Sequence, residues 1–201
     1  MDKARLESFS DGVFGFAITL LVLGVQVPVL KTVNDTELRA GLLQCLSQLV
    51  PYVTSFATIG IIWLNHHAMF SSVERVEHTT LSLNLFLLLV VTFIPYPTAV
   101  LSRYGALPSS ASLYGCALTL LGSAYSLLWM HLVRRKLTSA AAHPRLNRRR
   151  LQRNLAGTVM YPLGSVIALR FPHISIAIYA LVASFYFVPS PVQYYDCKDS
   201  Q

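Results

Sequence analysis

The chain has 201 residues, of which 54% are hydrophobic and 12% are charged, and its formal net charge is +7. Soluble domains carry about 25% charged residues, so this composition indicates a membrane protein and leaves no room for a separate soluble domain. No nucleic-acid-binding motif accompanies the positive charge, which excludes nucleic acid as an expected partner.

Six apolar segments are predicted to cross the lipid bilayer as α-helices, which makes the fold class all-α and the chain a single polytopic membrane domain, 1–201. The first segment follows two basic residues, as a signal peptide would. However, Asp11 interrupts its start and no small-x-small cleavage site follows Val25, so we expect a retained helix that ends at Pro28. The six predicted spans are 8–27, 41–64, 81–101, 111–133, 155–169 and 174–188.

The second span is about 24 residues long, enough to cross a hydrocarbon core of about 30 Å with some tilt. The polar stretch before it, 29–39, is expected to be a loop. The span ends in an aromatic and polar cluster at the depth expected for a membrane interface. The cluster contains Trp63, Asn65, His66, His67 and Phe70.

The basic residues predict the orientation of the chain. A cytoplasmic amino terminus places 12 of the 16 Lys and Arg residues on the cytoplasmic side and 4 on the other side, these being Lys31, Arg39, Arg103 and Arg170. Because loops rich in Lys and Arg stay in the cytoplasm, we expect a multi-pass protein of the cell membrane with both termini inside. The same rule explains the densest basic run, 134–153, as a cytoplasmic loop. The alternative explanation is that this run binds anionic lipid or a partner.

Several small and polar residues of the apolar first helix lie on one side of it. At about 100° per residue, the residues within about 60° of Gly12 are Arg5, Ser8, Gly15, Phe16, Thr19, Leu23 and Gln26, and Leu20 lies at the margin. The spacing of the small and hydroxyl residues alone favours close helix packing. If this side faces water instead, the bulky residues form apolar constrictions between wetter layers, and narrow apolar rings gate by losing their water.

Asp11 lies about 100° away from this side, near the start of the helix. An isolated carboxylate at that depth costs several kcal/mol unless it is paired, so it needs a partner. His66 and His67 are at matching depth and are candidate donors, as is the indole N–H of Trp63. Arg5 is poorly placed to reach Asp11 along the same helix, being about 120° away.

These residues resemble those of a known family. Arg5-x-x-x-Phe9-Ser10-Asp11 matches the R-x-x-x-F-S-D signature of the transmembrane protein 175 family of potassium channels, and the cluster from Trp63 to Phe70 is similar to that of its bacterial members. The resemblance implies a homotetramer with six spans per subunit, in which four copies of the first helix line one pore in a bacterial plasma membrane. Potassium is then the permeant ion, and no cofactor is expected.

The resemblance also implies roles for individual residues. The bulky residues five, nine and twelve positions after the signature aspartate form the pore constriction; here they are Phe16, Leu20 and Leu23. The resemblance also implicates Thr19 in cation preference. The angular positions on the helix, rather than the resemblance, add Gly12 and Gln26 to the polar pore lining. The first constriction position is usually Ile or Leu, so Phe16 is a departure. Arg5, Ser10 and Asp11 are expected to form a buried stabilising network with Trp63, His66 and His67.

The same residues also allow three alternatives to a channel: a transporter, an enzyme and a metal site. A proton- or solute-coupled transporter is the main alternative, because Asp11 with the His66 and His67 pair could titrate in the membrane. An enzyme is not expected, since neither G-x-S-x-G nor H-E-x-x-H occurs in the chain. A metal site is not expected either, because adjacent histidines on a helix diverge and no carboxylate or cysteine completes a ligand set.

Overall fold

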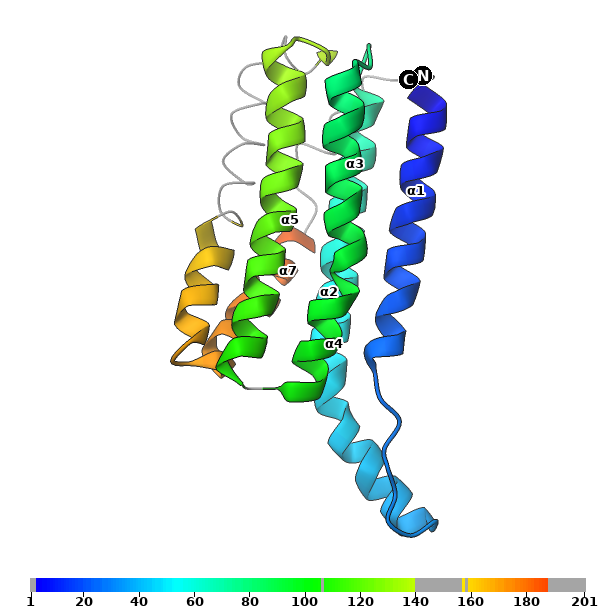
Figure 1. The fold of residues 1–201 in the computed structure, drawn as a ribbon, viewed down its shortest axis with the longest axis vertical. Helices are drawn as coiled ribbons and strands as arrows, with labels where there is room; N and C mark the ends of the chain where they lie inside the picture. The colour runs from blue at the N-terminus through cyan, green and yellow to red at the C-terminus, as the bar shows by residue number, and fades with distance from the viewer. Residues whose placement is uncertain (1–2, 106, 140–156, 158, 188–201) are drawn as a thin grey trace.

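The chain forms a bundle of upright helices (Figure 1). The structure is a computed structural model that describes residues 3–105, 107–139, 157 and 159–187. The labelled elements in this part of the chain are α1 (Lys3–Leu20), the 3₁₀ helix η1 (Leu21–Gly24), α2 (Asp35–Ser71), α3 (His78–Phe93), α4 (Pro95–Tyr104), α5 (Pro108–Arg134) and α7 (Pro172–Phe187). The first helix, α1, contains the signature residues from Arg5 to Asp11.

Four helical stretches within the described ranges are long and apolar enough to cross a membrane. They are Lys3–Gly24, Asp35–Ser71, His78–Tyr104 and Pro108–Arg134. The predicted spans 155–169 and 174–188 coincide with two shorter apolar helices, Val159–Ala168 and Pro172–Tyr186, and their outer ends lie outside the described residues. The all-α membrane fold is therefore confirmed, whereas the count of six spans stays a prediction.

The first helix ends earlier than Pro28. The α-helix stops at Leu20, η1 continues to Gly24, and the backbone of Val25 is extended. A Cβ atom on Gly24 would lie 3.1 Å from the Cβ of Ala99, so the absence of a side chain lets this turn pack directly on α4. The residue before a proline is also disfavoured in helical geometry, and the valines before Pro28 favour an extended chain.

The second helix begins at Asp35 rather than at Gly41, so part of the predicted loop 29–39 is helical. The side chain of Asn34 accepts a hydrogen bond of 2.8 Å from the backbone N–H of Glu37, which caps the helix. At 37 residues, α2 is about 55 Å long, and its first turns extend beyond the other helices (Figure 1). The helix continues through Pro51, which lies buried inside it.

Buried hydroxyl groups tie three helices together inside the apolar bundle. The Oγ of Ser55 in α2 lies 2.8 Å from the Oγ1 of Thr98 in α4 and 2.8 Å from the hydroxyl of Tyr114 in α5. All three side chains are at most 1% exposed. Thr98 stands just after the break between α3 and α4, where Pro95 has no N–H to continue the helix. The network therefore holds the broken third span against its neighbours.

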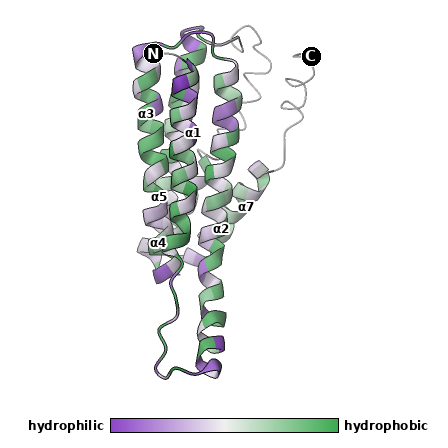
Figure 2. Ribbon diagram, turned by 90° about the vertical axis from the view of Figure 1, so that its right-hand side faces the viewer, coloured by the Kyte–Doolittle hydropathy of each residue, from purple (hydrophilic) through white to green (hydrophobic). Residues whose placement is uncertain are grey.

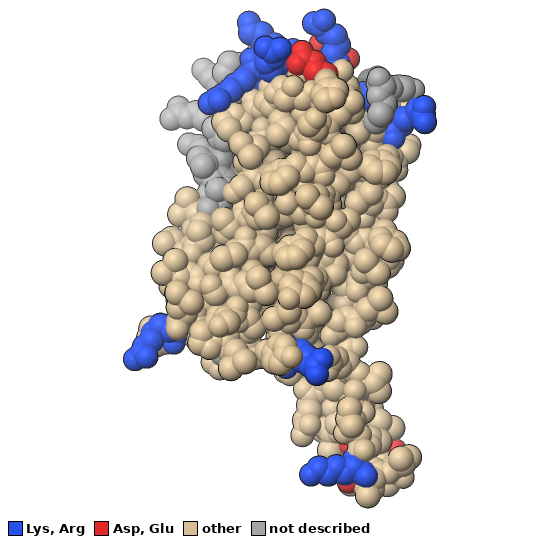
Figure 3. All heavy atoms as spheres, in the orientation of Figure 1, with Lys and Arg blue, Asp and Glu red and all other residues tan. Residues whose placement is uncertain are grey.

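Charged side chains gather at the two ends of the bundle on the face shown in Figure 3, and uncharged residues lie between them. Figure 2 shows hydrophobic residues along the helices that connect these ends. The end that holds the start of α1 and the ends of α2 and α5 carries Lys3, Arg5, Arg75, Arg134, Arg135 and Lys136. The opposite end carries Lys31, Arg39, Arg103 and Arg170. The remaining basic residues lie outside the described part of the chain. The separation agrees with the topology predicted for the described residues.

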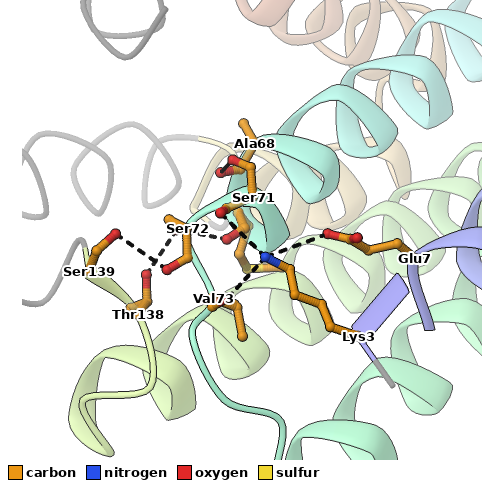
Figure 4. A network of polar contacts seen from close by, with 9 residues as sticks. Lys3, Glu7, Ala68, Ser71, Ser72, Val73, Thr138 and Ser139 are labelled. Atoms are coloured by element: carbon orange, nitrogen blue, oxygen red, sulfur yellow. Dashed lines mark hydrogen bonds and ion pairs between the residues drawn. The ribbon is translucent and has the colours of Figure 1, made fainter. Parts of the chain in front are cut away.

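The start of α1 is tied to the connection between α2 and α3 (Figure 4). The ammonium group of Lys3 donates to the carbonyl oxygens of Val73 at 2.9 Å and Ser71 at 3.4 Å, and lies 4.0 Å from Glu7. The same connection pairs with the segment after α5, because Ser139 donates its N–H to the Ser72 carbonyl at 3.0 Å and Val73 bridges Thr138. Three chain segments thus meet at one end of α1.

Replacing Lys3 by methionine is expected to lower the free energy of unfolding by about 0.3–1 kcal/mol, because a cation at the carbonyl end of α2 is lost. The thermal unfolding of the purified protein in detergent measures the change. Lys31→Met is the matched control, since Lys31 is exposed and its ammonium forms no hydrogen bond or ion pair within the described residues. Equal destabilisation by both substitutions would contradict the role of Lys3.

Candidate functional site

The first helix has one face inside the bundle and one face outside it. Leu6, Ser10, Phe14 and Ala17 are at most 2% exposed. Their spacing of three or four residues places them on a single face, which packs on α2 and α3. The side that contains Gly12 is therefore turned away from the other described helices.

The predicted pore-lining residues lie on this outward side. The side chains of Phe16 and Leu23 are 62% and 76% exposed, and Leu20 is half-buried. Gly12 and Thr19 are exposed as well, as is Gln26 in the extended segment beyond η1. We call this set of six residues the outward face.

Within the described residues, no other segment packs closely against the glycines on this side of α1. A Cβ atom added to Gly12 or Gly15 would have no atom of that part of the chain within 4 Å. The hydroxyl of Thr19 donates to the carbonyl of Phe16 at 2.8 Å, which leaves its oxygen lone pairs on the outward face. A packing role for this side of α1 would therefore need a partner from outside the described residues.

The buried polar residue of the signature forms a three-residue network across the bundle. The side chain of Ser10 accepts a hydrogen bond of 3.0 Å from the amide of Asn84 in α3. The Oδ1 of Asn84 lies 2.8 Å from the Nε2 of His66 in α2. All three side chains are at most 1% exposed, and His66 also lies between the rings of Phe14 and Phe70. We call Ser10, Asn84 and His66 the buried triad.

Asp11 has a different partner. Its Oδ1 accepts a hydrogen bond of 2.8 Å from the indole N–H of Trp63, and both side chains are exposed. His67 is exposed and its ring lies 6.3 Å from that of Trp63. Arg5 is exposed and forms no side-chain hydrogen bond or ion pair with the described residues. The prediction of one buried network is therefore wrong in part: Ser10 and His66 lie in the buried triad, whereas Asp11 and Trp63 form a separate exposed pair. Arg5 and His67 are exposed and belong to neither group.

Asn84 was not among the residues singled out from the sequence. It lies in the apolar run 81–101, 74 positions from Ser10, and no local motif relates the two residues. The sequence did contain one signal, an amide side chain one turn inside the predicted span 81–101. Such a group must find a hydrogen-bonding partner when lipid surrounds the bundle.

Comparison with known proteins places these residues in a wider group. Residues 5–95 match the family described as endosomal/lysosomal potassium channel TMEM175. A potassium channel of Streptomyces collinus is 36% identical over 197 residues, which cover 92% of this chain and 91% of that protein. A potassium channel of Chamaesiphon minutus is 41% identical over 133 residues, which cover 65% of this chain and 66% of that protein.

A solved structure has the same fold. It is described as a lysosomal potassium-selective channel TMEM175 homolog from Chamaesiphon minutus, and it superposes on this chain with a TM-score of 0.81 at 32% identity. The superposition covers 92% of this chain and 95% of the other. The likeness therefore extends well beyond the stretch that the family match covers.

Proposed function

The chain belongs to the TMEM175 family of channels, and we propose that four copies of it form a potassium-preferring cation channel in the cell membrane. The observation that supports this proposal is the outward face of α1. On the surface of a membrane helix, that face places Thr19 between the bulky apolar residues Phe16 and Leu20, with Gly12 before them. Four such faces around one axis would enclose a path that alternates between polar and apolar layers.

The constriction of this pore would be formed by four copies each of Phe16, Leu20 and Leu23. An apolar ring repels water, so an ion that crosses it loses part of its hydration shell. Sodium holds its water more tightly than potassium does, and the ring therefore penalises sodium more. No T-V-G-Y-G segment occurs in the chain, so the proposed preference for potassium does not rely on a filter of that type. Thr19 would supply oxygen atoms between the apolar rings.

The transporter alternative has less support. It needs a titrating unit made of Asp11 and the histidine pair, yet Asp11 binds Trp63 while His66 binds Asn84. The relatives from Streptomyces collinus and Chamaesiphon minutus are both named as potassium channels, which favours a channel. In reconstituted vesicles, potassium flux that neither saturates nor depends on a counter-ion would agree with the channel proposal.

The proposed orientation has the amino terminus in the cytoplasm. The end of the bundle that holds the start of α1 carries six basic residues of the described part, and the other end carries four. The basic residues between 145 and 153, which lie outside the described ranges, join the first group by chain order. The positive-inside rule then supports two cytoplasmic termini.

Thr19→Val is expected to lower the permeability of potassium relative to sodium, because the hydroxyl oxygens between the apolar rings are lost. The reversal potential under mixed potassium and sodium measures this ratio. Thr92→Val is the matched control, since Thr92 is exposed on α3 and its hydroxyl donates to the Leu89 carbonyl at 2.9 Å, as Thr19 does to Phe16. An unchanged reversal potential in Thr19→Val would remove Thr19 from the selectivity mechanism. A wild-type protein that carries no potassium current would refute the channel.

A further inference from the structure

Two residues of α2 hold the backbone of Gln26, just beyond the end of the first helix. The N–H of Gln26 donates to the side-chain Oε1 of Gln48 at 2.8 Å. The carbonyl of Gln26 accepts from the thiol of Cys45 at 3.4 Å, and the amide of Gln48 lies 3.7 Å from the same sulfur. Both backbone groups of Gln26 are therefore paired with one turn of α2.

This contact replaces the hydrogen bonds that the chain loses where η1 ends. The backbone of Val25 is extended, and the segment from Val25 to Pro28 belongs to no helix and has no helical ladder of its own. It lies close to α2 at its other end too, because a Cβ on Gly41 would be 2.6 Å from the Cβ of Pro28. The turn of α2 that carries Gln48 is itself held by Ser102 of α4, whose hydroxyl donates to the Gln48 carbonyl at 3.3 Å.

The side chain of Gln26 remains exposed although its backbone is held. Leu23, three residues earlier, is also turned outward. We propose that Gln48 is a positioning residue of the channel: its carboxamide holds the Gln26 backbone and thereby places the Gln26 side chain as a polar ring at the pore mouth farthest from the amino terminus. This inference rests on the proposed function.

The ligand of this ring is a monovalent cation that has begun to lose water. A side-chain amide offers a neutral oxygen, which replaces a water molecule without trapping the ion by charge. Four such oxygens help only if they are held in place, since ordering flexible groups when the ion arrives costs free energy. Gln48 acts before the ion arrives, by fixing the backbone from which the amide extends.

Gln48→Leu is expected to lower potassium current that enters through this mouth about twofold relative to current in the opposite direction, because the ring is no longer preorganised. Single-channel currents in symmetrical 1 M KCl measure this ratio, at a salt concentration where the screening length is about 3 Å. Gln48→Glu keeps an acceptor oxygen at the same place and is expected to preserve the ratio. Gln44→Leu is the matched control, because Gln44 is exposed one turn away and its side chain has no partner within the described residues.

Gln26→Ala removes the ring itself and leaves the contact with Gln48 intact, because that contact uses the backbone. It is expected to reduce current in the same direction as Gln48→Leu does. It also keeps the proposal testable if Gln48→Leu does not fold. Equal loss in both directions in Gln48→Leu, or an unchanged ratio in Gln26→Ala, would overturn the proposal. The wild-type protein would still conduct in either case, whereas a wild type without potassium current would refute the channel instead.

Discussion

Replacing Phe16 by alanine is expected to raise the single-channel potassium current roughly three- to tenfold, which corresponds to a barrier lower by about 0.7–1.4 kcal/mol. In the proposed tetramer, four phenyl rings leave the first constriction at once. The wider ring admits water, so the ion loses less of its hydration shell when it crosses. The preference for potassium over sodium should fall in the same variant, since dehydration is the proposed source of that preference.

Phe185→Ala is the matched control for this experiment. Phe185 is 61% exposed on α7 and Phe16 is 62% exposed on α1, so both substitutions remove an outward phenyl ring from an apolar helix. Among the described elements, α7 packs mainly on α2 and α5. The control should therefore conduct like the wild type. A current that is unchanged in Phe16→Ala, or raised equally in both variants, would place the constriction elsewhere.

Replacing Asn84 by leucine is expected to lower the free energy of unfolding by about 1–3 kcal/mol, because a buried polar group is left without its partner. Asn84 is 0% exposed and links Ser10 to His66 across three helices. Without its amide, the imidazole loses a 2.8 Å hydrogen bond inside the bundle. Thermal unfolding of the purified protein in detergent measures the loss.

A double-mutant cycle separates this hydrogen bond from the change in packing. His66→Phe keeps a ring between Phe14 and Phe70 and removes the imidazole nitrogens. Because replacing both partners of a buried hydrogen bond by apolar groups costs less than removing one, the double variant should lose less stability than the sum of the single variants. Strict additivity would show that Asn84 and His66 are not coupled.

The outward face of α1 could be predicted from the sequence because it depends on the period of one helix. Gly12, Thr19 and Phe16 recur at three- and four-residue intervals, and helical geometry alone places them together. The sequence could not show whether that side faces lipid, another helix or water. Buried Phe14 on the opposite side and open space above Gly12 settle its direction within the subunit.

The partners of the polar residues could not be predicted, because they come from distant parts of the chain. Nothing near Ser10 points to Asn84, and nothing near Gln26 points to Gln48. The start of α2 is a different case. Asn34 and Glu37 have the spacing of a capping box, and the observed hydrogen bond from Glu37 to Asn34 shows that this local signal was present in the sequence.

In the proposed channel, four copies of α1 surround one conduction path. Electron cryomicroscopy of the protein in lipid nanodiscs tests this arrangement. We expect a fourfold assembly in which Phe16, Leu20 and Leu23 point to the axis and the buried triad lies inside each subunit. A monomer, or an assembly in which the outward face of α1 contacts lipid, would contradict it.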